Sequence, residues 1–324
     1  MKRLMKLLAA GLLALGTLGA CANRPEENSE GGGSPKIVVT IFPIYDWVMN
    51  ILGDNPAGMD VTMLMQNGSD LHNYQPTADD IRKIADCDVF VCVGGESDKW
   101  VDDALKEAVN TDMKVIRLMD VIGSDLKVEE AVEGMEAEEE GEEEEEEYDE
   151  HVWLSLRSAM KCVTALSEAI ADKDSDNKAL YLRNAADYSA QLSALDQEYA
   201  SMVSSAQRHL LLFGDRFPFR YLTDDYDLAY YAAFKGCSAE TEASFETVLF
   251  LAGKLKEEKL PAVMIIEGSD GKIADTIIRT AEVKDCGVLT LDSMQSVTRD
   301  RVEKGAAYID IMKQNLEILR KALN

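Results

Sequence analysis

Short apolar runs alternate with segments of helical spacing from residue 36 to the C-terminus. Such runs, each followed by a helical segment, are typical of buried strands in parallel sheets. One helix start is marked by Thr77 and Asp80, which have the spacing of a capping box. The runs lie at 37–42, 61–65, 89–93 and 115–118, and again at 209–213, 229–234, 263–267 and 288–291. The pattern predicts an α/β fold with two (βα)4 lobes, each built on a parallel sheet.

A long region without strand signals separates the two sets of runs. Within residues 177–206, apolar side chains such as Leu192, Leu195 and Tyr199 recur near helical spacing. A helix of about thirty residues would be roughly 45 Å long at about 1.5 Å per residue. We expect a rigid helix that joins the lobes, and a helical hairpin packed on one lobe is the alternative.

The N-terminus has the features of a targeting segment. Basic residues precede the apolar stretch 7–18, which is too short to remain as a span of a bilayer core roughly 30 Å thick. The small residues that lead into Cys21 resemble the bacterial lipobox. We expect a signal peptide at 1–20, lipidation of Cys21, a flexible tether at 21–35 and an extracytoplasmic protein anchored to the cell membrane. An ordinary secreted protein is the alternative.

Charge excludes one class of partner and marks one unusual segment. Lys plus Arg number 33 and Asp plus Glu number 60, a formal net charge of −27 that repels nucleic acid. Residues 129–150 hold fifteen acidic residues and no basic one. Mutual repulsion predicts a disordered loop there, either attracting cations to a nearby site or acting as a solvated spacer.

The loops after the predicted strands hold two of the three histidines. In open α/β sheets, ligands bind outside the carboxyl ends of the strands. His72 and His151 lie in such loops of the first half, and we expect both to bind metal. The third, His209, opens a predicted strand, which favours an edge or surface position.

Acidic residues follow the strands of the second half. Asp215 and Asp292 lie in two of these loops, and Glu240 and Glu242 lie in a third. Imidazole combined with carboxylate suits Zn²⁺ or Mn²⁺ better than Ca²⁺, which prefers oxygen alone. These acidic side chains also suit helix starts, so helix capping is the alternative.

Five cysteines follow Cys21 and form no Cys-x-x-Cys pair. An odd number argues against a disulfide framework, although one disulfide remains open. Most of these cysteines, such as Cys92 and Cys162, are expected to be small apolar core residues.

Three motifs together resemble one protein family. They are His-Asn-Tyr-Gln-Pro-Thr at 72–77, Asp-Glu-His-Val-Trp-Leu-Ser at 149–155, and Asp292-Ser293 followed by Gly-Ala-Ala-Tyr at 305–308 and Asn315-Leu316. In order and spacing they resemble the zinc- and manganese-binding lipoprotein receptors of bacterial ABC importers. The resemblance covers residues 36–324. It implies two (βα)4 lobes, at 36–154 and 208–324, joined by one long helix within the linking region 155–207. It also implies a metal ion that is held between the lobes for delivery to a membrane permease. We expect a monomer.

The resemblance also implies a set of ligands. His72 and His151 match the two histidine ligands of the first lobe, and Asp292 matches the carboxylate of the second. The family has His or Glu where this chain has Gly214, so Asp215 is the expected substitute and Glu240 the reserve. We expect Zn²⁺, with Mn²⁺ as the alternative.

Two other functions are alternatives to metal import. The first is an adhesin or scaffold lipoprotein whose metal site is structural or vestigial. The second is a metallohydrolase, which is disfavoured because a filled coordination sphere leaves no position for a reactive water. We therefore expect a binding protein and not an enzyme.

Overall fold

The computed structural model describes residues 34–136, 147–238 and 242–324. None of the helices in this part of the chain is long and apolar enough to cross a membrane. The expected signal peptide, Cys21 and Glu240 lie outside the described residues, as does most of the glutamate run.

The first sheet is parallel and has the order β2-β1-β3-β4. Val38 in its centre pairs with Thr62 on one side and Phe90 on the other. Its strands are β1 (Lys36–Val39), β2 (Asp60–Met63), β3 (Val89–Cys92) and β4 (Lys114–Arg117), and its helices are α1 (Phe42–Leu52), α2 (Ala78–Ala85), α3 (Trp100–Lys106) and α4 (Leu118–Ile122). Each predicted run of the first half therefore contains or overlaps a strand.

The second sheet is also parallel and has the order β6-β5-β7-β8. Its strands are β5 (Leu210–Phe217), β6 (Ala229–Lys235), β7 (Ala262–Ile266) and β8 (Gly287–Leu291), and its helices are α7 (Arg220–Asp225), α8 (Phe245–Glu257) and α9 (Lys272–Ala281). β5 is longer than its apolar run because it continues past a register shift between Phe213 and Arg216. The predicted two-lobed α/β fold is confirmed.

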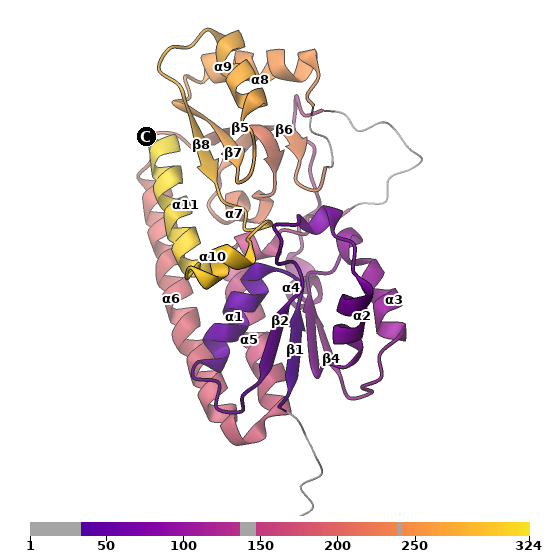
Figure 1. Cartoon of the computed structure of the whole chain (residues 1–324). Helices are drawn as coiled ribbons and strands as arrows, with labels where there is room; N and C mark the ends of the chain where they lie inside the picture. The colour runs from indigo at the N-terminus through magenta and orange to yellow at the C-terminus, as the bar shows by residue number, and fades with distance from the viewer. Residues whose placement is uncertain (1–33, 137–146, 239–241) are drawn as a thin grey trace, which may run out of the picture. The chain divides into compact units, whose positions relative to one another are not determined.

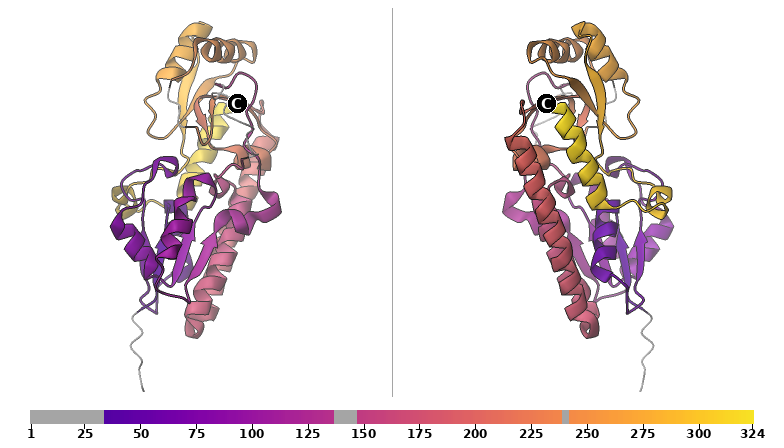
Figure 2. Two further views of the ribbon diagram at one scale, coloured as in Figure 1. Left: turned by 90° about the vertical axis from the view of Figure 1, so that its right-hand side faces the viewer. Right: turned by 90° about the vertical axis from the view of Figure 1, so that its left-hand side faces the viewer.

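Two helices fill the region between the sheets along the chain. α5 (Leu156–Lys173) and the 27-residue α6 (Lys178–Ser204) form a hairpin. α6 also contacts α11 (Tyr308–Ala322), which contacts β8 of the second sheet and follows the short α10 (Arg299–Glu303). Figures 1 and 2 show α6 running from the level of the first sheet to that of the second. The predicted long helix is confirmed, and it begins as one arm of a hairpin.

The two lobes share one hydrophobic core. A single cluster of buried side chains includes Val39 of β1, Trp47 of α1, Leu192 of α6, Phe213 of β5 and Leu291 of β8. Smaller clusters lie under α8 and α9 and beside α2 and α3. The lobes are therefore packed together through α1, α6 and α11, and not joined by a tether alone.

Candidate metal site

His72 lies in a short 3₁₀ turn, η1 (Leu71–Asn73), after β2. The Asp70 carboxylate accepts a hydrogen bond from the His72 backbone N–H at 3.0 Å and so caps this turn. The His72 Nδ1 atom lies 2.8 Å from Ser97 Oγ and 3.6 Å from Glu150 Oε2. These contacts hold the buried ring with its Nε2 atom directed away from them.

His151 is fully buried and immediately precedes another 3₁₀ turn, η4 (Val152–Leu154). Asp149 Oδ1 accepts from the His151 backbone N–H at 2.8 Å and lies 3.0 Å from its Nδ1. An ionised carboxylate only accepts hydrogen bonds, so in the neutral imidazole the proton sits on Nδ1 and the lone pair is on Nε2. A carboxylate that orients an imidazole in this way is common at metal sites.

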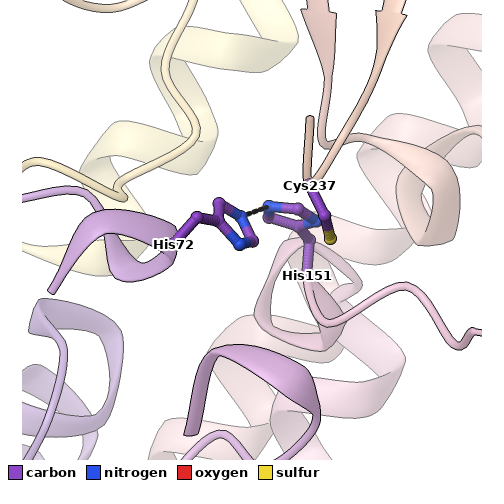
Figure 3. A group of neighbouring side chains, drawn as sticks. All are labelled: His72, His151 and Cys237. Carbon is purple, nitrogen blue, oxygen red and sulfur yellow. Dashed lines mark hydrogen bonds between the residues drawn. The ribbon is translucent and has the colours of Figure 1, made fainter. Parts of the chain in front are cut away.

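The free nitrogens of the two rings face each other. His72 Nε2 and His151 Nε2 are 3.1 Å apart (Figure 3). Two nitrogens bound to one tetrahedral Zn²⁺ at about 2.05 Å would be roughly 3.3 Å apart, so the pair is close to a ligand geometry. Burial and the charge of His151 hold the pKa of His72 below its ordinary value, which keeps this ring in the neutral form that binds metal. Burial lowers the pKa of His151, but Asp149 outweighs that effect and raises it above its ordinary value.

Cys237, just beyond β6 in the second lobe, completes the group. Candidate ligand atoms of His72, His151 and Cys237 all lie within 4.8 Å of one another, and Figure 3 shows the thiol beside the His151 ring. The Cys237 backbone N–H donates to Glu129 Oε1 at 2.9 Å. Burial, followed by the charge of Glu129, raises the pKa of the thiol above its ordinary value.

Gly236 allows β6 to end against His151. A Cβ atom at this position would lie 3.2 Å from His151 Cε1 and 2.8 Å from the Phe217 carbonyl oxygen. Contacts under 3.0 Å with backbone require something to shift. A residue with a side chain at 236 would therefore move this segment away from the imidazole.

An amide from the loop after β8 also reaches both rings. Gln295 Nε2 contacts His151 Nε2 and lies 3.4 Å from His72 Nε2. Glu267 holds this loop because its carboxylate accepts from the Gln295 and Ser293 backbone N–H groups. Burial and the charge of Asp292 raise the pKa of Glu267 to about 7. The second lobe therefore presents an amide and a thiol to the imidazoles of the first.

Asp292 and Asp215 have other partners. Asp292 forms an ion pair with Arg301 at 2.8 Å and accepts from the Met294 backbone N–H at 2.9 Å. Asp215 accepts from two backbone N–H groups and lines a pocket of about 670 Å³. Within the described residues, neither belongs to the group of His72, His151 and Cys237. Their assignment as ligands stays a prediction.

Two further sequence interpretations can be compared with the structure. His209 is exposed at the start of the second sheet, as expected. Cys237 is half-buried and is not among the expected ligands, yet it follows β6, at the carboxyl edge of the sheet where the other candidates were expected. The five cysteines after Cys21 are all free thiols.

Two parallel α/β lobes with a buried imidazole pair and a thiol between them define a two-lobed binding protein for a transition-metal ion. Comparison with known proteins makes the assignment specific. The chain belongs to the ZnuA family, described as "Zinc-uptake complex component A periplasmic", whose model matches residues 37–322. It is a family of solute-binding proteins and not of enzymes.

Named relatives agree with this family. The chain is 31% identical to the high-affinity zinc uptake system protein ZnuA of Bacillus subtilis, over 94% of this chain and 93% of the relative. It is 30% identical to the zinc-binding lipoprotein AdcA of Streptococcus pneumoniae, over 98% of this chain and 60% of the relative. The chain thus spans less than two thirds of AdcA. The Zn(II)-bound ZnuA-like domain of AdcA superposes with a TM-score of 0.69 at 28% identity, covering 90% of this chain and 99% of that domain.

Proposed function

We propose that this chain captures Zn²⁺ between its two lobes outside the cytoplasm and delivers it to the permease of an ABC importer. The observation that carries the proposal is the pair of buried imidazole Nε2 atoms 3.1 Å apart. Ser97 and Asp149 hold their Nδ1 atoms, so both Nε2 atoms are directed at the point where one ion would be bound. The names of AdcA and the B. subtilis relative support zinc as the ion.

The proposal includes membrane anchoring. Residues 1–20 act as a signal peptide, Cys21 carries the lipid, and residues 21–35 tether the monomeric body of residues 36–324. Within that body we assign residues 36–154 and 208–324 to the two lobes and residues 155–207 to the linking helices. Metabolic labelling with a fatty acid tests the anchor. The wild-type chain should be labelled, a Cys21→Ser variant should not, and equal labelling of the two would contradict lipidation at this residue.

Metal binding is tested on the full chain purified in detergent, stripped of metal and titrated with Zn²⁺ and Mn²⁺. Native mass spectrometry with elemental analysis should find one tightly held ion, which His72→Ala loses. His209→Ala is the matched control, because this histidine is exposed at the start of β5. An absence of stoichiometric ion in the wild-type chain, or equal loss in both variants, would sink the proposal.

Delivery is tested by growth of a deletion strain in zinc-depleted medium. The wild-type chain should restore growth and His151→Ala should not, because His151 supplies one of the two facing nitrogens. Equal growth with both would favour the adhesin or scaffold function, in which the metal site plays no part in uptake.

A further inference from the structure

We propose that the thiolate of Cys237 is the third protein ligand of the ion, so that the site is a nitrogen-nitrogen-sulfur set that selects Zn²⁺ against Mn²⁺. This inference rests on the proposed function and specifies its donors. His72 and His151 both belong to the first lobe, so an ion held by them alone would not join the lobes. Cys237 follows β6 of the second lobe, and its sulfur lies within 4.8 Å of the imidazole ligand atoms (Figure 3).

The strand beside β6 cannot supply this donor. Gly214 lies in β5 at the register shift, and a Cβ atom there would be 2.8 Å from the Cα and 2.9 Å from the N of Ala274 in α9. The backbone of α9 therefore excludes a side chain at 214. β6 pairs directly with β5, and its end approaches His151 because residue 236 is glycine. The second lobe thus supplies its donor, Cys237, from the end of β6 and not from β5.

Each of the three donors has a carboxylate partner. Asp149 lies 3.0 Å from His151 Nδ1, and Glu150 lies 3.6 Å from His72 Nδ1. Glu129 accepts the backbone N–H of Cys237. Carboxylates that orient ligands are typical of the outer shell of metal sites. A Zn²⁺ ion with one thiolate and two neutral imidazoles carries a net positive charge, which these carboxylates offset.

All three carboxylates come from the two ends of the acidic segment. These ends are held together by the backbone hydrogen bond from Glu129 N–H to the Glu147 carbonyl and by the bridge between Val128 and Tyr148. The ends of the acidic segment therefore position ligands, whatever the glutamates between them do.

The donor set decides the choice of metal. Thiolate is a soft ligand that favours Zn²⁺, whereas Mn²⁺ prefers carboxylate, carbonyl and water oxygens. On binding, the thiol releases its proton to solvent as the metal–sulfur bond forms. The fourth position is left for a water molecule or for a side chain of the second lobe, such as Gln295 or the predicted ligand Asp292.

X-ray absorption at the zinc edge tests the ligand directly in the unmodified full chain. We expect one sulfur at about 2.3 Å beside nitrogen at about 2.0–2.1 Å. Cobalt substitution should add a sulfur-to-metal charge-transfer band. Cys237→Ser should lose both signals, and Cys286→Ser should keep them, because Cys286 is a half-buried free thiol elsewhere in the second lobe.

Affinity gives the second readout. Loss of an outer-shell partner typically weakens metal binding by roughly 10–100-fold, and loss of a ligand should cost at least as much. Cys237→Ser should therefore weaken Zn²⁺ binding by at least this factor, and it should change Mn²⁺ binding far less. If the variant fails to fold, alkylation of the unmodified chain replaces it. Zn²⁺ should then slow the labelling of Cys237 and leave that of Cys286 unchanged.

The outcomes separate this inference from the proposed function. One bound ion with only nitrogen and oxygen neighbours, or equal labelling of Cys237 with and without Zn²⁺, would overturn the thiolate ligand and leave zinc binding intact. Equal losses of Zn²⁺ and Mn²⁺ affinity would overturn the selectivity. A wild-type chain that binds no ion would overturn both proposals.

Discussion

At the scale of single residues, the site depends on partners that fix each ring. Asp149 holds His151 by two hydrogen bonds to one carboxylate oxygen, and Ser97 holds His72. These contacts determine which nitrogen faces the ion. They also explain why two histidines from separate loops present the same type of atom to one point.

Replacing Asp149 by Asn should weaken Zn²⁺ binding by about 10-fold, because the amide keeps the shape of the carboxylate but not the charge that makes His151 a stronger ligand. Competition with a chelating dye measures the change. Asp79→Asn, on the exposed face of α2, should leave the affinity as it is. Undiminished affinity in Asp149→Asn would show that the charge of the carboxylate does not make His151 a stronger ligand.

Sequence reasoning selected His72 and His151 because both follow strands in a chain with three histidines, and the structure brings these two side chains together. It did not select Cys237, since cysteines commonly serve as small apolar core residues. Only the ending of β6 against His151, with Gly236 at the contact, distinguishes this thiol. The partner of Asp292 could not be predicted either, because Arg301 reaches it from nine residues further along the chain.

At the scale of elements, the apolar runs predicted each of the eight strands found in the described residues, and the capping box of Thr77 and Asp80 is present at the start of α2. The strands and the capping box could be predicted because both depend on residues that are close in sequence. The hairpin of α5 and α6 was harder to predict, since it depends on the packing of α6 against helices that are distant in sequence. One such contact joins Asp46 of α1 to Tyr188 of α6, whose hydroxyl donates to the carboxylate at 3.0 Å.

This contact should give the fold a pH dependence. Burial raises the pKa of Asp46 to about 6 from 3.8. A carboxyl whose pKa is higher in the folded than in the unfolded state stabilises the fold fully below about pH 4, and this contribution is lost as pH rises through about 6. Relative to wild type, Asp46→Asn should therefore gain about 2 kcal/mol of unfolding free energy between pH 4.5 and pH 7.

Urea unfolding of the metal-free chain at the two pH values measures this difference. The comparison with Asn cancels the general effect of the net charge, because all other titrating groups are common to both proteins. A constant difference between wild type and variant across the range would show that Asp46 keeps an ordinary pKa.

At the scale of the whole molecule, an ion pair crosses between the lobes beside the site. Arg216 of β5 contacts Asp70 at 2.6 Å, and it also donates to the Ser238 carbonyl at 3.4 Å. Asp70 caps the turn that carries His72, and Ser238 follows Cys237. Arg216 therefore links the loops that hold donors from opposite lobes.

Arg216→Gln should speed Zn²⁺ release about tenfold, since truncating one partner of a mostly buried charge pair acts chiefly on dissociation. Stopped-flow transfer to a chelator measures the rate. Arg299→Gln, which loses only an exposed pair within α10, should release the ion at the wild-type rate. Identical rates in both variants would mean that the ion pair does not restrain the loops.

The negative charge of the molecule should increase the rate at which Zn²⁺ binds. The chain carries a net charge of −27, and eight glutamates lie between residues 138 and 146. Replacing these eight by Gln should slow Zn²⁺ association at low ionic strength, because an acidic surface raises the local cation concentration. The difference should vanish at high salt. An association rate that is insensitive to both changes would make the segment a spacer.

Under the proposed delivery function, the core that both lobes share determines what a permease can sense. Swinging the lobes apart would expose side chains of α1, α6 and α11 and break the hydrogen bond from the Trp153 indole to the Ser293 carbonyl. The angle between the lobes is therefore a poor indicator of cargo. A permease that accepts loaded receptors and rejects empty ones must instead recognise the surfaces of the few loops around the ion. Under the proposed function, these loops would both hold the metal and report its presence.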